Sequence, residues 1–246
     1  MKQYGLIGHP LTHSFSKRYF TEKFIAEGIN DCHFENYDLD SINDFKTLLN
    51  NNPTLHGLCV TIPYKQEVIQ FLDHVDFAVQ TIGACNSIHF KEGKLYGYNT
   101  DTLGFEKALK EKIKPIHDKA LILGTGGASK AVAYVLNNMQ IPFKTVSRKP
   151  SEINEINYDQ LSAEVMEEHR LIINTTPLGM YPNVASCPSI PYSYLTKDHF
   201  LFDLVYNPEE TVFLQKGKAF NAQISNGYHM LIYQAEASWK IWNDLK

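Results

Sequence analysis

Short apolar runs alternate with amphipathic stretches along the whole chain. Apolar runs of this length are typical of buried strands, and they occur at 4–7, 33–39, 55–62, 85–90, 94–98, 120–123, 143–146, 171–173 and 200–205. Between the first two runs, Phe15, Tyr19, Phe20 and Phe24 recur at helical spacing, and Gly28 suits a helix end. Regular alternation of strands and helices predicts an α/β fold.

Three later stretches also have helical spacing. A helix is expected after Asp101, before a charged connector at 111–119. A second is expected to run to about residue 139 and a third over 227–245. The aromatic residues Phe71, Phe77, Trp239 and Trp242 are predicted to be core.

Composition limits the classes of protein to consider. At 246 residues, one or two domains are expected. The net charge of −4 gives no basic footprint for nucleic-acid binding. We also expect no membrane partner, because the sequence contains neither a long apolar span nor a signal peptide pattern. Four scattered cysteines predict reduced thiols and a cytoplasmic protein.

A glycine-rich turn follows the predicted strand at 120–123 and opens a helix. It comprises Gly124, Thr125, Gly126, Gly127, Ala128 and Ser129. Glycines permit a tight turn and close approach of a ligand, and the N–H groups of a helix start attract a pyrophosphate. The context predicts nucleotide binding, against the alternative of an ordinary strand-to-helix turn.

The residues after the next strand indicate which nucleotide. Ser147, Arg148 and Lys149 follow the strand at 143–146. An acidic residue in this position binds the ribose hydroxyls of NAD, whereas an arginine accommodates the 2′-phosphate of NADP. Two cations without a carboxylate therefore favour NADP, although they are also compatible with a solvated surface pair.

Lys65 and Asp101 are candidates for proton transfer. Lys65 lies just beyond a predicted strand, where ligands of open α/β sheets gather. A lysine beside a carboxylate exchanges a proton with a substrate hydroxyl while a hydride moves. Spacing does not show that the two residues meet, and on spacing alone each is interpreted as an isolated surface charge. Nearby polar residues suited to a polyhydroxylated acid are Ser14, Ser16, Thr61, Asn86, Asn99 and Gln234.

Other catalytic signatures are absent from the sequence. The ten histidines show no metal-ligand spacing, so no metal is expected. There is no GxSxG elbow and no P-loop.

Taken in order, eight motifs resemble those of the shikimate dehydrogenase family across essentially the whole chain. The motifs are His13-Ser14-Phe15-Ser16 and the segments 60–65, 83–86, 97–101, 124–129, 174–180, 203–208 and 227–235. The resemblance implies two α/β domains with the active site in the cleft between them. The substrate-binding domain would comprise 1–101 and 225–246, and a Rossmann-like NADP-binding domain would comprise 102–224.

The resemblance also implies an activity, namely the reversible NADP-dependent reduction of 3-dehydroshikimate to shikimate. Lys65 would be the acid/base group, paired with Asp101. The substrate carboxylate would be bound by Ser14, Ser16 and Tyr206, and the ring hydroxyls by Thr61, Asn86, Asp101 and Gln234. The NADP phosphates would be bound by 124–129 and 147–149. The nicotinamide would lie near Leu204 and Gly227.

Three positions depart from the family pattern. Ser147 and Lys149 flank Arg148 where the family has asparagine and threonine, and His229 stands where many members have glycine. Three alternatives stay open: a quinate/shikimate dehydrogenase with relaxed substrate or NAD use, a non-catalytic sensor of these acids, and another NADP-binding reductase. We expect a monomer or a homodimer.

Overall fold

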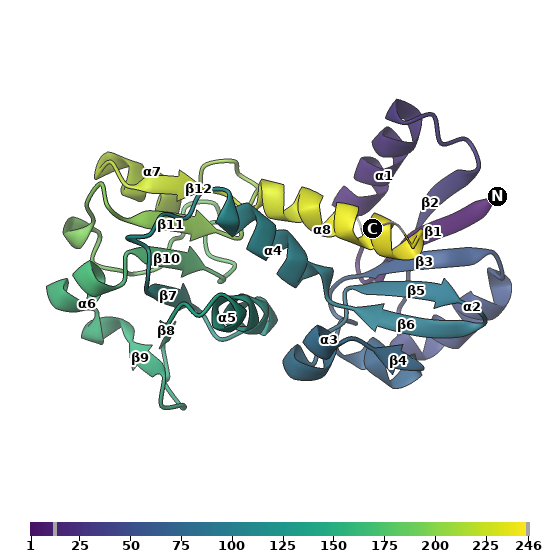
Figure 1. Ribbon diagram of the computed structural model, residues 1–246, viewed down its shortest axis with the longest axis horizontal. Coiled ribbons are helices and arrows are strands. Elements are labelled where there is room, and N and C mark those ends of the chain that lie inside the picture. Colours follow the sequence, from purple (N-terminus) through teal and green to yellow (C-terminus); the bar gives the residue numbers. More distant parts are fainter. Residues whose placement is uncertain (12–13, 245–246) are drawn as a thin grey trace. The chain divides into compact units, whose positions relative to one another are not determined.

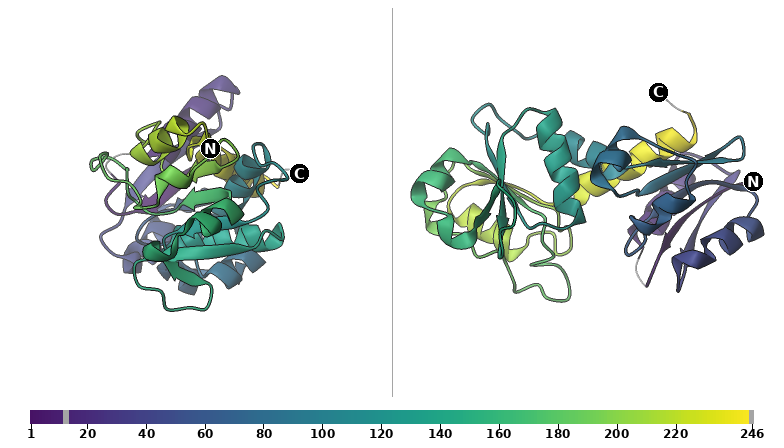
Figure 2. Two further views of the ribbon diagram at one scale, coloured as in Figure 1. Left: turned by 90° about the vertical axis from the view of Figure 1, so that its left-hand side faces the viewer. Right: turned by 90° about the horizontal axis from the view of Figure 1, so that it is seen from below.

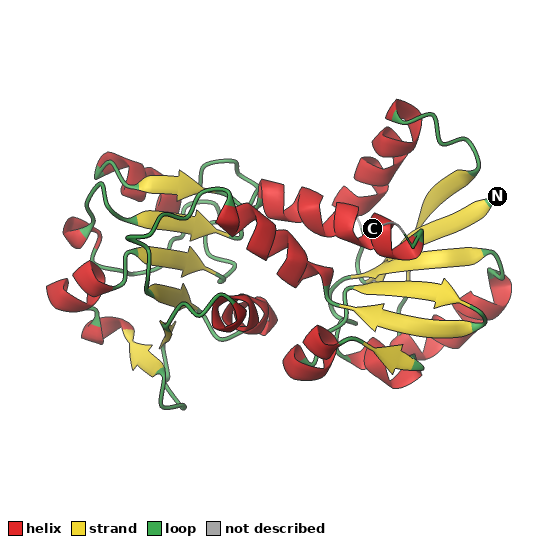
Figure 3. Cartoon of the chain, viewed as in Figure 1, coloured by secondary structure: helices red, strands yellow, loops and turns green. Residues whose placement is uncertain are grey.

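The computed structural model describes residues 1–11 and 14–244. The chain divides into two compact units. Unit 1 comprises Met1–Leu103 and Gln234–Lys246, and unit 2 comprises Gly104–Tyr233. Strands and helices alternate in both units (Figures 1 and 3). The predicted α/β fold class is therefore confirmed.

Unit 1 contains a mixed six-stranded sheet. Its strands are β1 (Lys2–Gly8), β2 (Cys32–Asp38), β3 (Leu55–Val60), β4 (His74–Val75), β5 (Ser87–Lys91) and β6 (Lys94–Tyr98). They lie in the order β2-β1-β3-β5-β6-β4. The first three are parallel, whereas β5 is antiparallel to both of its neighbours. The carboxyl ends of β1 and β3 therefore meet at one edge, next to the amino end of β5.

Helices cover both faces of this sheet. On one face, α1 (Phe15–Ala26) and the part of α8 (Tyr228–Trp242) from Gln234 onward pack on Tyr4 and Phe34. On the other face, α2 (Phe45–Asn51) and α3 (Phe77–Ile82) pack on Leu58 and Ile88. In this way the last helix of the chain shares a core with residues from the first hundred.

Unit 2 contains a fully parallel six-stranded sheet. Its strands are β7 (Ala120–Leu123), β8 (Phe143–Ser147), β9 (Glu155–Asn157), β10 (Leu171–Asn174), β11 (Phe200–Asp203) and β12 (Gln223–Ser225). The order is β12-β11-β10-β7-β8-β9. Numbered within the unit, this is 6-5-4-1-2-3, the strand order of Rossmann folds. Ligands of such sheets bind where the order reverses, which here is between β7 and β10.

The helices of unit 2 also cover both faces of its sheet, as the right-hand view of Figure 2 shows. The part of α4 (Thr100–Lys110) from Gly104 and α5 (Gly127–Asn138) pack on Ile122 and Phe202. On the other face, α6 (Ala163–Glu168) and α7 (Val212–Ala219) pack on Leu121 and Leu201. Every residue of β7, β10 and β11 is buried, which explains the apolar runs of these three adjacent strands.

One predicted core residue is wrong. Trp239 and Trp242 are buried, but Phe77 is 70% exposed. Phe77 is the first residue of α3, directly after the cap Asp76, so its side chain leaves the helix away from the buried Ala78 and Val79. In the described part of the chain, none of the helices is long and apolar enough to span a membrane.

Candidate functional site

Lys65 and Asp101 meet in unit 1. Lys65 Nζ lies 2.6 Å from Asp101 Oδ2 in an ion pair. The two side chains keep 32% and 22% of their surface exposed, so a ligand can still reach the pair. Asp101 lies in the first turn of α4, where the helix dipole favours a carboxylate. The pairing that spacing left open is thus a feature of the structure.

Two adjacent residues hold the chain on both sides of this ion pair. The backbone N–H of Cys85 donates to the Lys65 carbonyl at 2.7 Å. The side-chain oxygen of Asn86 accepts from the Thr100 backbone N–H at 2.6 Å. One dipeptide between α3 and β5 therefore fixes the loop that carries Lys65 and the helix start that carries Asp101.

Asn86 and Gln234 lie side by side next to the same helix start. Asn86 Nδ2 donates to Thr100 Oγ1 at 3.0 Å and to Gln234 Oε1 at 3.4 Å. Both amides are buried, with 3% and 6% exposure. A residue of the last helix thus joins residues of the first hundred.

The predicted hydroxyl residues of unit 1 stand in local contacts. Ser14 caps α1, and its Oγ accepts from the Lys17 N–H at 3.1 Å. Ser16 lies next to the buried Cys59 thiol, and burial raises the pKa of that thiol to about 12. Thr61 follows β3, and its N–H continues the ladder to the Ile7 carbonyl at 2.9 Å. All three are partly exposed beyond the ends of β1 and β3.

Unit 2 has a cavity of about 940 Å³ at the carboxyl ends of its central strands. It lies where the strand order reverses, as expected for a nucleotide site. None of the described residues that line it is acidic. Its walls include three segments: 124–126 after β7, 146–149 at the end of β8 and directly after it, and 175–178 after β10.

The glycine turn leaves room for a ligand beside the backbone. A Cβ on Gly126 or Gly127 would meet no atom within 4 Å. Gly124 differs, because its φ is +106° and its Cβ would approach Thr176 to 2.9 Å. Gly126 caps α5 without a side-chain hydrogen bond to the first N–H groups of that helix. The turn thus offers backbone donors to an anion.

Arg148 and Lys149 line this cavity at the end of β8. Ser147 also lines it, and its hydroxyl accepts from the Lys149 N–H at 3.2 Å. Two cations therefore stand at a strand end, next to a hydroxyl that holds their loop. This arrangement fits the 2′-phosphate of NADP.

Some predicted cofactor and substrate residues lie outside this cavity. Gly127, Ala128 and Ser129 belong to the first turn of α5 and are not among the described lining residues. Leu204 and Gly227 are in contact, since a Cβ on Gly227 would lie 2.1 Å from the Leu204 carbonyl oxygen. Tyr206 is 40% exposed and belongs to unit 2, unlike the other predicted substrate residues.

Eight of the described lining residues were not predicted as cofactor residues. They are Val146, Asn157, Tyr158, Thr175, Thr176, Pro177, Leu178 and Ser189. The threonines had a usable signal, because they follow the strand β10 that lies next to β7. Ser189 had none, since it reaches the cavity from an irregular segment far along the chain.

Asp203 is a buried carboxylate at the end of β11. It accepts from Asn174 Nδ2 at 2.9 Å, from Thr211 Oγ1 at 2.6 Å and from the Val205 N–H at 3.0 Å. Burial raises its pKa to about 6. These bonds hold the start of the segment that carries Leu204 and Tyr206. Across 1–11 and 14–244, no cluster of three His, Cys, Asp or Glu side chains could hold a metal ion.

Comparison with known proteins identifies relatives along the whole chain. A sequence profile for the shikimate dehydrogenase substrate binding domain matches residues 6–88. The chain is 39% identical to the NADP(+) shikimate dehydrogenase of Methanococcus maripaludis, covering 100% of this chain and 93% of that one.

Solved structures are similar as well. Thermus thermophilus shikimate 5-dehydrogenase in complex with NADP(H) and shikimate has a TM-score of 0.87 and 29% identity, covering 100% of this chain and 94% of that one. Corynebacterium glutamicum quinate dehydrogenase in complex with NAD also has a TM-score of 0.87. Its identity is 27%, covering 99% and 94% of the two chains.

Proposed function

The chain belongs to the shikimate dehydrogenase family, and we propose that it catalyses the reversible NADP-dependent reduction of 3-dehydroshikimate to shikimate. The observation that carries this proposal is the Lys65–Asp101 ion pair, at 2.6 Å, beside Asn86 and Gln234. An acid/base group next to amides suits a substrate whose reacting hydroxyl has hydroxyl neighbours on the same ring.

Lys65 is the group that donates and accepts the proton. In the reduction its ammonium donates a proton to the oxygen that becomes the 3-hydroxyl, and in the oxidation the amine takes that proton back. Asp101 holds the lysine in place through the ion pair. When bound, NADPH supplies the hydride to carbon 3. Proton transfer by a positioned side chain contributes about 10²–10⁴-fold to the rate.

The rest of the substrate is bound by the other predicted residues of the site. The ring hydroxyls are bound by Thr61, Asn86, Asp101 and Gln234. The carboxylate is bound by Ser14, Ser16 and Tyr206. We propose 1–101 with 225–246 as the substrate-binding domain and 102–224 as the NADP-binding domain.

Residues of unit 2 fit NADP. The N–H groups of 124–129 bind the pyrophosphate, and 147–149 bind the 2′-phosphate. The open space beside Gly126 and the two cations without a lining acid support this assignment. Leu204 and Gly227 stand near the nicotinamide.

A second candidate is a quinate/shikimate dehydrogenase with relaxed substrate or NAD use. The similarity to a quinate dehydrogenase structure in complex with NAD favours it. The test is an assay of the purified protein with shikimate or quinate, each with NADP⁺ or NAD⁺. We expect reduced cofactor only from shikimate with NADP⁺. Comparable rates with quinate or NAD⁺ would favour the second candidate, and binding without turnover would favour a sensor.

We further propose that the enzyme is cytoplasmic and either a monomer or a homodimer. Light scattering of the purified protein distinguishes these two states, and cell fractionation tests the location.

A further inference from the structure

A chain of buried polar groups connects α8 to the first turn of α4. Its members are Asn86, Thr100, Gln234 and Ser238, each at most 6% exposed. All four belong to unit 1. Thr100 is the residue directly before Asp101, and neither Thr100 nor Ser238 has a role in the proposed reaction.

Hydrogen bonds join these four side chains to one another. Ser238 Oγ donates to the Gln234 backbone carbonyl at 3.0 Å. The Ser238 and Thr100 hydroxyls lie 3.0 Å apart, and either oxygen can be the donor of this contact. Thr100 Oγ1 accepts from Asn86 Nδ2 at 3.0 Å and is also placed to donate to Asn86 Oδ1 at 3.2 Å.

The backbone N–H of Thr100 fixes how the Asn86 amide is turned. The Thr100 N–H is only a donor, so Oδ1 of Asn86 faces it, at 2.6 Å. Nδ2 therefore points to Thr100 Oγ1 and to Gln234 Oε1. The contact to Gln234 is 3.4 Å, which is long for an N–H···O bond. A ring hydroxyl can replace this contact without disturbing the shorter ones.

We infer that Thr100 is a positioning residue for substrate recognition, whose hydroxyl orients the Asn86 amide and, through Ser238, keeps α8 and Gln234 in register with Asp101. The inference rests on the proposed function. Thr100 touches neither the Lys65 ammonium nor the cavity of unit 2 in any described contact. Its loss should therefore weaken recognition of shikimate and leave the cofactor site unchanged.

The chain offers a matched control in the same helical turn. Thr102 is also buried, and its Oγ1 donates to the Asn99 carbonyl at 2.6 Å. It has no recorded hydrogen bond to Asn86, Gln234 or Ser238. Thr100→Val and Thr102→Val each remove one buried hydroxyl with little change of shape, so both should lower the stability to a similar extent.

The experiment is steady-state kinetics of the full chain with shikimate and NADP⁺, together with thermal unfolding of each variant. For Thr100→Val we expect the KM for shikimate to rise about tenfold while the KM for NADP⁺ stays unchanged, since loss of one buried hydrogen bond is worth about one order of magnitude. Thr102→Val should leave both KM values unchanged. Thr100→Ser keeps the hydroxyl and should restore most of the shikimate KM.

Two results would overturn the inference alone. One is an unchanged shikimate KM in Thr100→Val, and the other is an equal rise in Thr102→Val. If Thr100→Val does not fold, Ser238→Ala is compared with Thr100→Ser, which keeps the hydroxyl, and a shikimate KM no higher in Ser238→Ala than in Thr100→Ser counts against it. If the unsubstituted protein neither oxidises nor binds shikimate, the proposed function fails and the inference fails with it.

Discussion

At the scale of single residues, the dipeptide Cys85-Asn86 determines where the proposed acid/base pair stands. Its backbone N–H holds the Lys65 carbonyl, and its side chain holds the start of α4 before Asp101. Lys65 and Asp101 are 36 positions apart in the sequence. The dipeptide nevertheless binds Lys65 itself and Thr100, the residue directly before Asp101. The ion pair is therefore preorganised, which suits a proton transfer that needs fixed geometry.

Replacement of Lys65 tests its chemical role. We expect Lys65→Ala to lower kcat by about 10²–10⁴-fold with a much smaller change in the KM for shikimate, because the proton transfer occurs in the transition state. Steady-state kinetics measures both. Lys91→Ala is the control, since Lys91 also pairs with a carboxylate of unit 1, that of Asp244. An unchanged kcat in Lys65→Ala would defeat the acid/base assignment.

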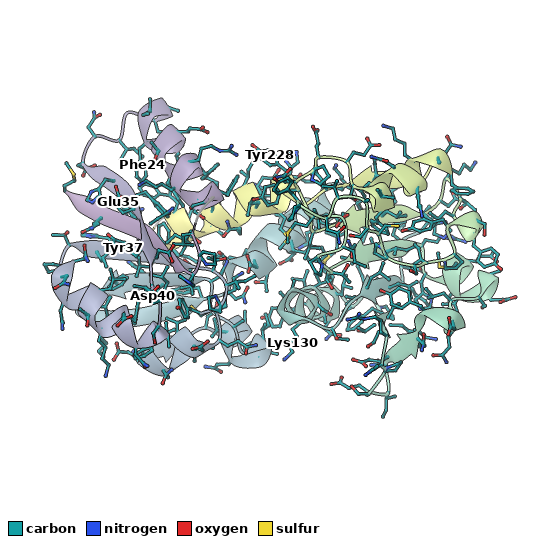
Figure 4. The ribbon with its side chains drawn as sticks, turned by 180° about the vertical axis from the view of Figure 1, so that it is seen from behind. Phe24, Glu35, Tyr37, Asp40, Lys130 and Tyr228 are labelled. Atoms are coloured by element: carbon teal, nitrogen blue, oxygen red, sulfur yellow. The ribbon has the colours of Figure 1, made fainter. Side chains whose placement is uncertain are left out.

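Arg148 offers a second prediction at this scale. We expect Arg148→Ala to raise the KM for NADP⁺ by about 10- to 100-fold, the loss typical of a charge-assisted hydrogen bond to phosphate. The KM for NAD⁺, which lacks that phosphate, should change little. Lys130→Ala is the control, because Lys130 projects from α5 (Figure 4) and does not line the cavity. Equal effects on both cofactors would contradict this role of Arg148.

At the scale of elements, the turn between β7 and α5 combines a strained position with an open one. Gly124 needs glycine for its own backbone, because its φ is +106° and Thr175 and Thr176 lie close. Gly126 has φ −77° and ψ −176°, which other residues adopt freely, and no atom lies near its missing side chain. The structure alone does not require glycine at 126, so a bound ligand is the reason we assign to it.

The two glycines should therefore respond differently to alanine. Gly124→Ala is expected to lower the free energy of unfolding by about 2 kcal/mol or more. Gly126→Ala should cost less than about 1 kcal/mol but raise the KM for NADP⁺ at least tenfold. Urea unfolding and NADP⁺ kinetics measure the two effects. If Gly126→Ala leaves the KM for NADP⁺ unchanged, this turn does not hold the pyrophosphate.

The sequence predicted the strands of unit 2 more completely than the helices. The run 120–123 coincides with β7, and the run 143–146 falls one residue short of β8. Every residue of β7 is buried and apolar, so each contributes to the signal, whereas in the partly buried β8 the signal comes from Phe143 and Val146. The helices α2, α3, α6 and α7 have only six to eight residues. Two turns or fewer give too few periodic positions to recognise.

The candidate site was predictable in its residue types but not in its contacts. Lys65 and Asp101 are joined by the fold of the sheet, which no local pattern reports. Thr100 and Ser238 look like ordinary helical residues, and only their placement on facing elements reveals a hydrogen bond. Whether Phe77 is buried likewise depends on the side of α3 from which its side chain projects. Six residues are too few for periodicity to predict that side.

At the scale of the whole molecule, unit 2 depends on histidines that stay neutral. His117, His169 and His199 are all below 5% exposed. His199 Nδ1 accepts from the Thr196 N–H, and its Nε2–H donates to the Met166 carbonyl, each at about 3 Å. Burial lowers the pKa of all three rings, and nearby cations such as Arg170 add to this. Asp203 acts in the opposite sense, because burial raises its pKa to about 6.

These shifts predict loss of stability in mild acid. Since the folded pKa of each ring is lowered, its stabilising effect is complete above the unfolded value near pH ~6.5 and is lost as the pH falls below that value. Each ring contributes up to about 1.4 kcal/mol per pH unit. Protonation of Asp203 offsets part of this only below its pKa of about 6.

Urea unfolding between pH 7.5 and 5.5, followed by circular dichroism, measures this loss. His199→Gln retains hydrogen-bonding groups, but its side chain does not titrate. It should therefore reduce the slope of the free energy of unfolding against pH by up to about 1.4 kcal/mol per pH unit, the contribution of one proton. His74→Gln is the control, because His74 is exposed on β4 and stacks only on Tyr96 among the described rings. If His199→Gln keeps the slope of the unsubstituted protein, protonation of His199 does not contribute to the acid sensitivity.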